Sequence, residues 1–334
     1  KFLNKVNESD LEDGIYKGLL EGLNDPYSVY YTAEEYQKMM EQTSGTYSGI
    51  GALVSQNAET GIITVVKAFA DAPAAKAGVK NGDIIYKVKG KEVTGVDINN
   101  VVTEMKGEKG TTVDITVYRE SEKKYIDFTI TRDQVNEPTV EYKMLDKKKK
   151  IGYIQISQFE EVTYDQFTKA LDDLKKQGMK AVIFDVRSNP GGLYETVCKM
   201  LDEILPEGNL VSTKDKYGNE EKQTSDSKCL EMPMVVLQNK DSASASEIFA
   251  GAIQDFNAGK IVGTQSFGKG IVQTILPLSD GSAVKLTVQD YYTPSGKNIH
   301  GKGITPDVEA ELEENATSDT QLEKAKETIM ELMK

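Results

Sequence analysis

Three short segments of the chain carry residue types that could perform nucleophilic catalysis. The first is Asp241-Ser242-Ala243-Ser244-Ala245-Ser246-Glu247, between a predicted buried strand and a predicted helix. Such a turn presents a side chain at the carboxyl edge of a sheet, beside helix N-terminal amides that favour developing negative charge. A serine nucleophile and its oxyanion would suit this position. On this stretch alone, however, helix capping by serine is the favoured interpretation.

The second segment is Arg187-Ser188-Asn189-Pro190-Gly191-Gly192, which also follows a buried type of strand. Two adjacent glycines let backbone N–H groups approach a ligand closely, as an oxyanion hole requires. An ordinary tight turn before a helix is the alternative interpretation. Both segments follow the carboxyl ends of strands, where α/β sheets place their sites.

The third segment, Ser266-Phe267-Gly268-Lys269-Gly270-Ile271-Val272-Gln273, sets a lysine between two glycines at the start of an apolar strand. Burial there would lower the lysine pKa from ~10.4, which is what a lysine base needs. For a lone lysine, a solvated side chain at a glycine-rich turn is the stronger alternative. Residues 263–269 also fit the GxxxxGK pattern, but Gly270 replaces the Ser or Thr of a P-loop and a strand follows, so we exclude nucleotide binding.

His300 is the single histidine of the chain. A single histidine argues strongly against a histidine-rich zinc site. Any Ser-His-Asp triad would have to use this residue. Its surroundings, residues 295–301, form a glycine-rich polar loop, which indicates an exposed residue without a catalytic role. The SxxK match at residues 121–124 lies in a charged turn with no KTG motif downstream, so we treat it as chance.

Composition narrows the function classes further. The 334 residues include 53 acidic and 40 basic side chains, and the net charge of −13 argues against nucleic acid or anionic membranes as general partners. No run approaches the ~18 uncharged apolar residues of a membrane-spanning helix. Cys198 and Cys229 show no CxxC spacing, so we expect buried or idle thiols, and a disulfide between them stays open.

Hydrophobic patterning predicts a multidomain α+β chain. Residues 1–43 form an N-terminal helical region, in which Ser9 or Asp10 caps a first helix with an apolar residue every four positions. Residues 44–135 form a β-rich module with one helix at 98–105. Residues 136–334 alternate strands and helices, which indicates an α/β core that ends in a C-terminal helix at 320–334. We expect that last helix to pack on its own domain, with a dimer contact as the alternative.

Together these segments resemble the carboxyl-terminal processing proteases, which are serine endopeptidases with a PDZ domain and a Ser-Lys catalytic pair. The resemblance covers nearly the whole chain, and its motifs keep one order. They are Asp25-Pro26-Tyr27-Ser28-Val29-Tyr30, Ser48-Gly49-Ile50-Gly51, Ala77-Gly78, Asn81-Gly82-Asp83, Asn189-Pro190-Gly191-Gly192, Ser242 to Glu247, Phe267 to Gln273, residues 291–296 and residues 301–307.

The resemblance implies a role for each catalytic position. Ser244 would be the nucleophile, Lys269 the general base, and Gln273 the residue that holds the lysine amine in line with the serine. Oxyanion donors would be the N–H of Ala245 and that of Gly191 or Gly192. Acyl transfer of this kind needs no metal and no cofactor.

The resemblance also makes residues 44–135 a PDZ domain. Its loop Gly49-Ile50-Gly51-Ala52 would receive the terminal carboxylate of a peptide, which adds as a strand at the edge of the module. Family members often carry an arginine where this chain has Lys106 before Gly107. Lysine lacks the planar guanidinium fork, so this departure argues against gating by an arginine at that point.

The expected partners are proteins or peptides with exposed C-termini, and the expected location is extracytoplasmic, in the cell envelope or secreted. The resemblance is compatible with a membrane anchor in a segment before Lys1 and with a homodimer through the terminal helices. Two alternatives compete with an active peptidase. One is a catalytically weak or inactive PDZ peptide-binding regulator on a protease scaffold. The other is an esterase or amidase for small acyl substrates, which would need no groove for peptide tails.

Overall fold

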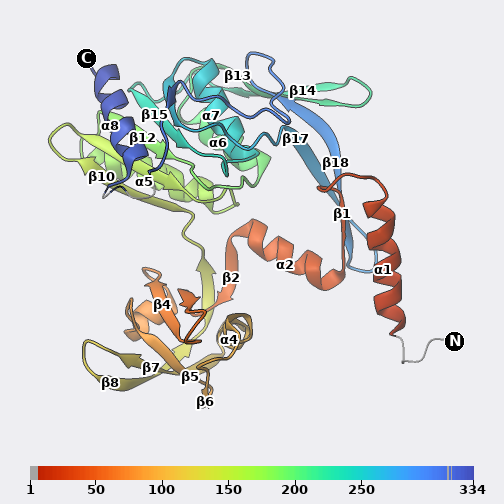
Figure 1. The fold of residues 1–334 in the computed structure, drawn as a ribbon, viewed down its shortest axis with the longest axis vertical. Coiled ribbons are helices and arrows are strands. Elements are labelled where there is room, and N and C mark those ends of the chain that lie inside the picture. The colour runs from red at the N-terminus through yellow and green to blue at the C-terminus, as the bar shows by residue number, and fades with distance from the viewer. Residues whose placement is uncertain (1–6, 314–315, 317) are drawn as a thin grey trace. The chain divides into compact units, whose positions relative to one another are not determined.

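The computed structural model describes residues 7–313, 316 and 318–334. It divides into two compact units, one formed by Gly45–Pro138 and the other by the chain up to Ser44 together with Thr139–Lys334 (Figure 1). The N-terminal helical region is therefore part of the same compact unit as the α/β core. A mixed α+β fold with a C-terminal helix, as the patterning predicted, is confirmed.

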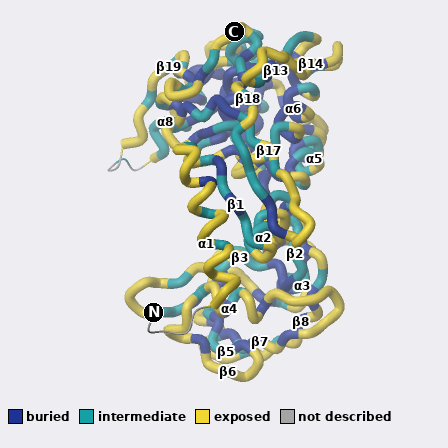
Figure 2. The backbone as a smooth tube through the Cα atoms, turned by 90° about the vertical axis from the view of Figure 1, so that its right-hand side faces the viewer, coloured by how far each residue is buried: buried dark blue, intermediate teal, exposed yellow. Residues whose placement is uncertain are grey.

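The N-terminal region consists of helix α1 (Glu8–Glu21), strand β1 (Val29–Tyr31) and helix α2 (Ala33–Ser44). Asn7 caps α1, with its side-chain oxygen accepting from the Ser9 N–H at 3.2 Å, so the expected cap at Ser9 or Asp10 is wrong. Asn competes well for this position because its short side chain reaches the unpaired amides of the first turn. Most of α1 is exposed (Figure 2). Its exposed apolar residues are Leu11, Ile15 and Leu19, and Leu23 just beyond its end is exposed as well.

The smaller unit is built around a sheet with the strand order β3-β4-β5-β7-β8, in which β6 also pairs with β5, and a β2–β9 ribbon. Strand β3 lies at the edge of this sheet. The core consists of the β-branched side chains that the sequence alternates with polar ones, such as Ile63, Val65, Ile85 and Val117. The elements are β2 (Thr46–Gly49), β3 (Ala52–Gln56), β4 (Ile63–Ala68), α3 (Pro73–Ala77), β5 (Ile84–Val88), β6 (Lys91–Glu92), α4 (Ile98–Met105), β7 (Thr112–Arg119), β8 (Lys124–Thr131) and β9 (Asp133–Asn136).

The larger unit contains a central sheet with the order β10-β11-β12-β15-β16-β19, parallel except for β10. Its strands are β10 (Val140–Asp146), β11 (Ile151–Ile156), β12 (Ala181–Asp185), β15 (Met234–Gln238), β16 (Gly259–Gly263) and β19 (Val308–Glu309). Helices α5 (Thr163–Lys176), α6 (Tyr194–Asp202) and α7 (Ala245–Asp255) bury their apolar faces against one side of it. Helix α8 (Thr320–Leu332) covers the other side, where Ala325 and Ile329 are fully buried (Figure 1). The expectation that this helix packs on its own domain is confirmed.

A second sheet in this unit joins β1 to β18 (Ala283–Tyr292), β13 (Gly208–Asp215) and β14 (Glu220–Ser225), while β17 (Ile271–Pro277) pairs with β18. Val29 of β1 lies opposite Lys285 of β18, and Gln273 of β17 lies opposite Thr287. The turn that precedes β1 is thereby brought next to the start of β17.

Candidate active site

Ser244 stands at the N-cap position of α7, directly after the turn that follows β15. Its backbone has φ 56° and ψ −115°, a conformation that residues with a Cβ rarely adopt and that costs about 1–3 kcal/mol where it occurs. The phenol of Tyr291, itself buried, donates to the Ser244 carbonyl oxygen at 3.1 Å. A strained, supported residue at a helix N-terminus lies beside amides that stabilise negative charge.

Glu247 connects this turn to the segment that carries Lys269. Its side chain is fully buried, and its two oxygens accept four hydrogen bonds. Oε2 accepts from the backbone amides of Ser244 and Lys269, both at 2.8 Å. Oε1 accepts from the Ser266 hydroxyl at 2.5 Å and the Gly268 amide at 2.7 Å. One carboxylate therefore fixes the backbone positions of both segments.

The glycine pair lies against Ser244, and neither position has room for a side chain. A Cβ on Gly191 would lie 2.8 Å from the Ser244 Cβ, and one on Gly192 would lie 2.2 Å from the Phe159 oxygen. The Gly191 amide already donates to Asn189 Oδ1 at 2.8 Å. The Gly192 and Ala245 amides have no acceptor among the residues that the structure describes. These two N–H groups are thus available to a ligand.

The Lys269 side chain is half-buried, and its Nζ lies 4.4 Å from the centre of the Tyr27 ring. Burial lowers the Lys269 pKa, and the nearby charge of Lys285 lowers it further, whereas Asp25 and Glu247 oppose the shift. A lowered pKa is the property that a lysine base requires. No hydrogen bond of Nζ is found within the described part of the chain.

Gln273 lies on β17, four residues beyond Lys269, but its side chain contacts a different group from the one expected. Its Nε2 donates to the Thr287 hydroxyl of β18 at 3.4 Å. Gln273 and Lys269 therefore lie near each other at the start of β17, but no hydrogen bond joins their side chains among the described contacts.

His300 is exposed, as the loop composition predicted, but it lies beside the segment of Lys269. Its Nδ1 accepts from the Gly270 amide at a long 3.4 Å. A Cβ on Gly270 would lie 2.6 Å from the His300 amide nitrogen, so glycine is required for this close approach.

In the smaller unit, the loop Gly49–Ala52 leads into the edge strand β3. The carbonyls of Ile50 and Gly51 accept from the amides of Ala74 (2.7 Å) and Phe69 (3.0 Å), and Ile50 is buried. Gly51 has φ 75°, and a Cβ there would lie 2.3 Å from that of Ala72. Engaged carbonyls fix this loop beside a sheet edge that can accept another strand. Lys106 places its Nζ 4.9 Å from the Tyr47 ring centre.

Comparisons with known proteins support one family. The model of peptidase family S41 matches residues 150–310, and a PDZ domain model matches residues 48–130. A carboxy-terminal-processing protease of Bartonella bacilliformis is 40% identical over 93% of this chain and 72% of its own length. The chain belongs to the carboxy-terminal processing proteases of peptidase family S41.

Other members of the family agree. The carboxy-terminal processing protease CtpA of Bacillus subtilis is 39% identical over 94% of this chain and 67% of its own length. A CtpA-like protease of Staphylococcus epidermidis is 39% identical, and the chain spans 62% of it. The solved photosystem II D1 C-terminal processing protease matches with a TM-score of 0.56 at 29% identity, covering 97% of this chain and 86% of that one.

Sequence reasoning for this family member missed three contacts of the site. Glu247 belongs to the serine segment, and a glutamate three residues after an N-cap serine is a capping signal from which its contact could have been predicted. Asn189 bonds to Gly191 only two residues away, and an asparagine that accepts from a nearby backbone amide is a turn signal that the sequence offers. Tyr27 gave no separate signal, because its partner Lys269 is distant in the sequence.

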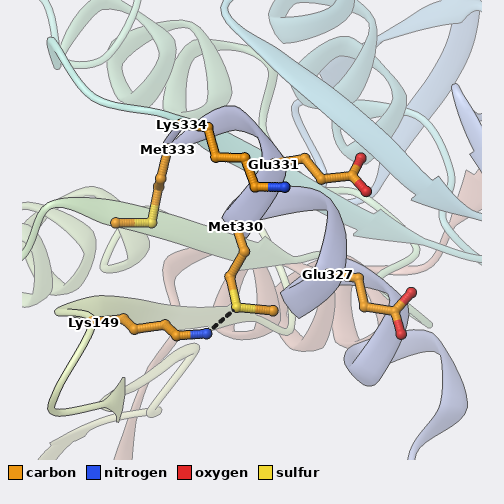
Figure 3. Close-up of a pocket in the computed structure, with 6 residues that line it drawn as sticks. All are labelled: Lys149, Glu327, Met330, Glu331, Met333 and Lys334. Atoms are coloured by element: carbon orange, nitrogen blue, oxygen red, sulfur yellow. Dashed lines mark hydrogen bonds between the residues drawn. The ribbon is translucent and has the colours of Figure 1, made fainter.

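Other features of this protease lie outside the site. A surface hollow on α8 is lined by Lys149, Glu327, Met330, Glu331, Met333 and Lys334, and the Lys149 amine donates to the Met330 sulfur (Figure 3). Cys198 and Cys229 are free, and burial raises the pKa of the Cys198 thiol to about 12. Among the described residues, no group of three His, Cys, Asp or Glu side chains could hold a metal ion. Within the same residues, no helix combines the length and apolar character needed to cross a membrane.

Proposed function

We propose that this protease captures the C-terminal tails of proteins through its PDZ domain and cleaves peptide bonds with Ser244 as nucleophile and Lys269 as base. The observation that carries the proposal is the buried Glu247, which binds the backbone amides of both residues through one carboxylate oxygen. A fixed relation between nucleophile and base is what an acyl-transfer site needs.

In the proposed reaction, neutral Lys269 accepts the hydroxyl proton of Ser244 while the serine oxygen bonds to the peptide carbonyl carbon. The carbonyl electron pair moves to its oxygen, and its return breaks the C–N bond as the Lys269 ammonium gives the proton to the leaving amine. Water then attacks the acyl carbon with Lys269 again as base, the ester bond to the Ser244 oxygen breaks, and the Lys269 ammonium returns its proton to that oxygen. Gln273 assists by orienting the lysine amine, which requires it to leave Thr287.

The developing oxyanion would accept from the amides of Gly192 and Ala245. Geometry favours Gly192 over Gly191, because the Gly191 amide is already bonded to Asn189. Backbone donors held in place before the reaction lower the barrier without reorganising during it.

The PDZ loop Gly49–Ala52 would bind the terminal carboxylate of a substrate tail through its backbone amides. The tail would continue as an added strand on β3, whose outer edge has no partner strand among the described residues. This mode selects substrates by an exposed C-terminus, with apolar side chains entering the groove.

We also propose an extracytoplasmic location, by analogy with the family, and self-association through α1. The support for self-association is three apolar residues of α1, Leu11, Ile15 and Leu19, with Leu23 just beyond its end, all between 57 and 69% exposed. The corresponding face of α8 is covered by its own sheet and is not available.

A PDZ peptide-binding regulator with weak or no activity is the second candidate. It is favoured by two observations: the Lys269 amine lies on the Tyr27 ring, and Gln273 is bonded to Thr287.

Cleavage of an unstructured protein with an apolar C-terminus distinguishes the two functions. We expect Ser244→Ala and Lys269→Ala each to abolish cleavage while peptide binding persists. Ser279→Ala and Lys180→Ala, at exposed positions of the same unit, are the matched controls. Full activity in Ser244→Ala or Lys269→Ala would refute the catalytic pair, and no activity in the unchanged protein would favour the regulator.

A further inference from the structure

The turn between α1 and β1 contacts the proposed catalytic lysine from the far end of the sequence. Tyr27, in the turn Asp25–Ser28, places its ring face 4.4 Å from Lys269 Nζ. An ammonium over an aromatic face at less than about 6 Å is attracted by the ring quadrupole. A neutral amine has no comparable attraction, so this contact distinguishes the two protonation states of Lys269.

Hydrogen bonds hold the turn rigidly against β18. Asp25 Oδ1 accepts from the Tyr27 amide at 3.1 Å, and its Oδ2 accepts from the Ser28 hydroxyl at 2.5 Å. The same Ser28 oxygen accepts from the Thr287 amide of β18 at 3.0 Å. Because Thr287 also accepts from the Gln273 side chain, one residue of β18 contacts both the turn and the assisting glutamine.

We propose that Tyr27 is a positioning residue of the peptidase reaction, which seats the Lys269 ammonium between proton uptake from Ser244 and proton delivery to the leaving amine. This inference rests on the proposed function. The proton goes from the serine hydroxyl to Lys269 and then to the amine nitrogen, so Tyr27 changes no bond. Its ring stabilises the charged state that exists only while the proton is on the lysine.

The groups that face Lys269 divide into two sets. Burial and the charge of Lys285 on β18 favour the neutral amine, which can act as a base. Asp25 of the turn, Glu247 of α7 and the Tyr27 ring favour the ammonium. A base must be neutral before the reaction and must then hold a proton. The first set of groups favours the neutral amine, and the second set stabilises the protonated one. Removal of the ring should therefore lower the Lys269 pKa and destabilise the protonated intermediate.

The test compares Tyr27→Phe, which keeps an aromatic face, with Tyr27→Leu, which removes it. The Lys269 pKa is measured by competitive labelling of its amine with acetic anhydride across pH, followed by peptide mapping. The pH dependence of kcat/KM is measured on an unstructured peptide. We expect Tyr27→Leu to move both midpoints to lower pH by about half to one unit, the size of a partly buried cation–π contact. Tyr27→Phe should stay within a few tenths of a unit of the original protein.

Fluorinated phenylalanines at position 27 keep the shape of the ring while they remove the negative potential of its face. These variants test the inference if Tyr27→Leu fails to fold. We expect the Lys269 pKa to fall step by step with each added fluorine. Tyr217→Leu is the matched control, since Tyr217 is 78% exposed and lies 5.0 Å from the Lys216 amine. We expect no change in the Lys269 pKa or in kcat/KM for that variant.

An unchanged Lys269 pKa in the Tyr27→Leu and fluorinated proteins overturns the inference. A pKa that moves without any movement of the kcat/KM limb also overturns it, because the contact would then not act on the reaction. Lys269→Ala tests the proposed function separately. Full cleavage by that variant would refute Lys269 as the base. Loss of cleavage in Lys269→Ala, together with an unchanged Lys269 pKa in the Tyr27 variants, would refute only the role of Tyr27.

Discussion

Glu247→Gln changes one atom of a buried carboxylate that accepts four hydrogen bonds. One oxygen faces the amides of Ser244 and Lys269, and the other faces the Ser266 hydroxyl and the Gly268 amide. An amide NH₂ is a donor, so in either orientation of the glutamine it opposes two donors. The Ser266 hydroxyl can rotate, but the three backbone N–H groups cannot.

The size of the effect follows from this count. A buried donor left without an acceptor costs about 1–3 kcal/mol. The loss is therefore about 1–3 kcal/mol if the NH₂ faces Ser266 and Gly268, where only the Gly268 amide is fixed, and about 2–6 kcal/mol if it faces the amides of Ser244 and Lys269. Domains of this kind are stable by about 5–15 kcal/mol, so the variant should fold with a clearly lowered Tm. If the NH₂ faces Ser244 and Lys269, both backbones shift, and a displacement of about 1 Å at reacting groups can cost about a hundredfold in rate.

Denaturant unfolding and peptide cleavage measure the two effects. We expect kcat to fall at least tenfold, with a smaller change in KM, because the substrate tail binds elsewhere. Glu207→Gln, an exposed position of the same unit, removes the same charge and should change neither quantity. Stability within about 0.5 kcal/mol of the original protein, the range of neutral surface changes, together with unchanged kcat, would refute the role we give to Glu247.

Three further predictions concern the base, the glycine pair and the PDZ loop. In a pH series, kcat/KM should rise as Lys269 loses its proton, with a midpoint below the ordinary 10.5 because burial lowers the Lys269 pKa; His300→Ala should leave that midpoint in place. Gly192→Ala should lower Tm and kcat in thermal and cleavage assays, since its Cβ would clash with Phe159, whereas Gly14→Ala, in open space on α1, should lower neither. Fluorescence anisotropy should show at least about tenfold weaker binding of a peptide when its C-terminal carboxylate is replaced by an amide.

Much of the fold could be predicted from hydrophobic patterning, because strands that are buried along their whole length are also apolar along their whole length. Strands β12 and β15 are buried throughout, and continuous apolar runs marked both of them. Strand β14 was missed because five of its six residues are exposed and its sequence, Glu-Glu-Lys-Gln-Thr-Ser, carries no alternation. Its pairing with β13 is a tertiary contact that local patterning does not encode.

The candidate site was predictable where its chemistry lies in short segments. The structure brings the glycine pair against Ser244, and it places Lys269 in a half-buried position with a lowered pKa. The contact of Tyr27 with Lys269 could not be predicted in the same way. It depends on the pairing of β1 with β18, which joins the beginning of the chain to its last third.

Two residues, Glu247 and Tyr27, therefore position the proposed base in different ways. Glu247 binds the Lys269 backbone amide, while the Tyr27 ring faces the end of the Lys269 side chain. The ring attracts an ammonium there and has no comparable attraction for a neutral amine. In the proposed reaction, a neutral Lys269 amine loses its attraction to the ring and turns toward Ser244. It follows that changes at Glu247 should disturb stability and rate together, whereas changes at Tyr27 should act mainly on the pH at which the enzyme works.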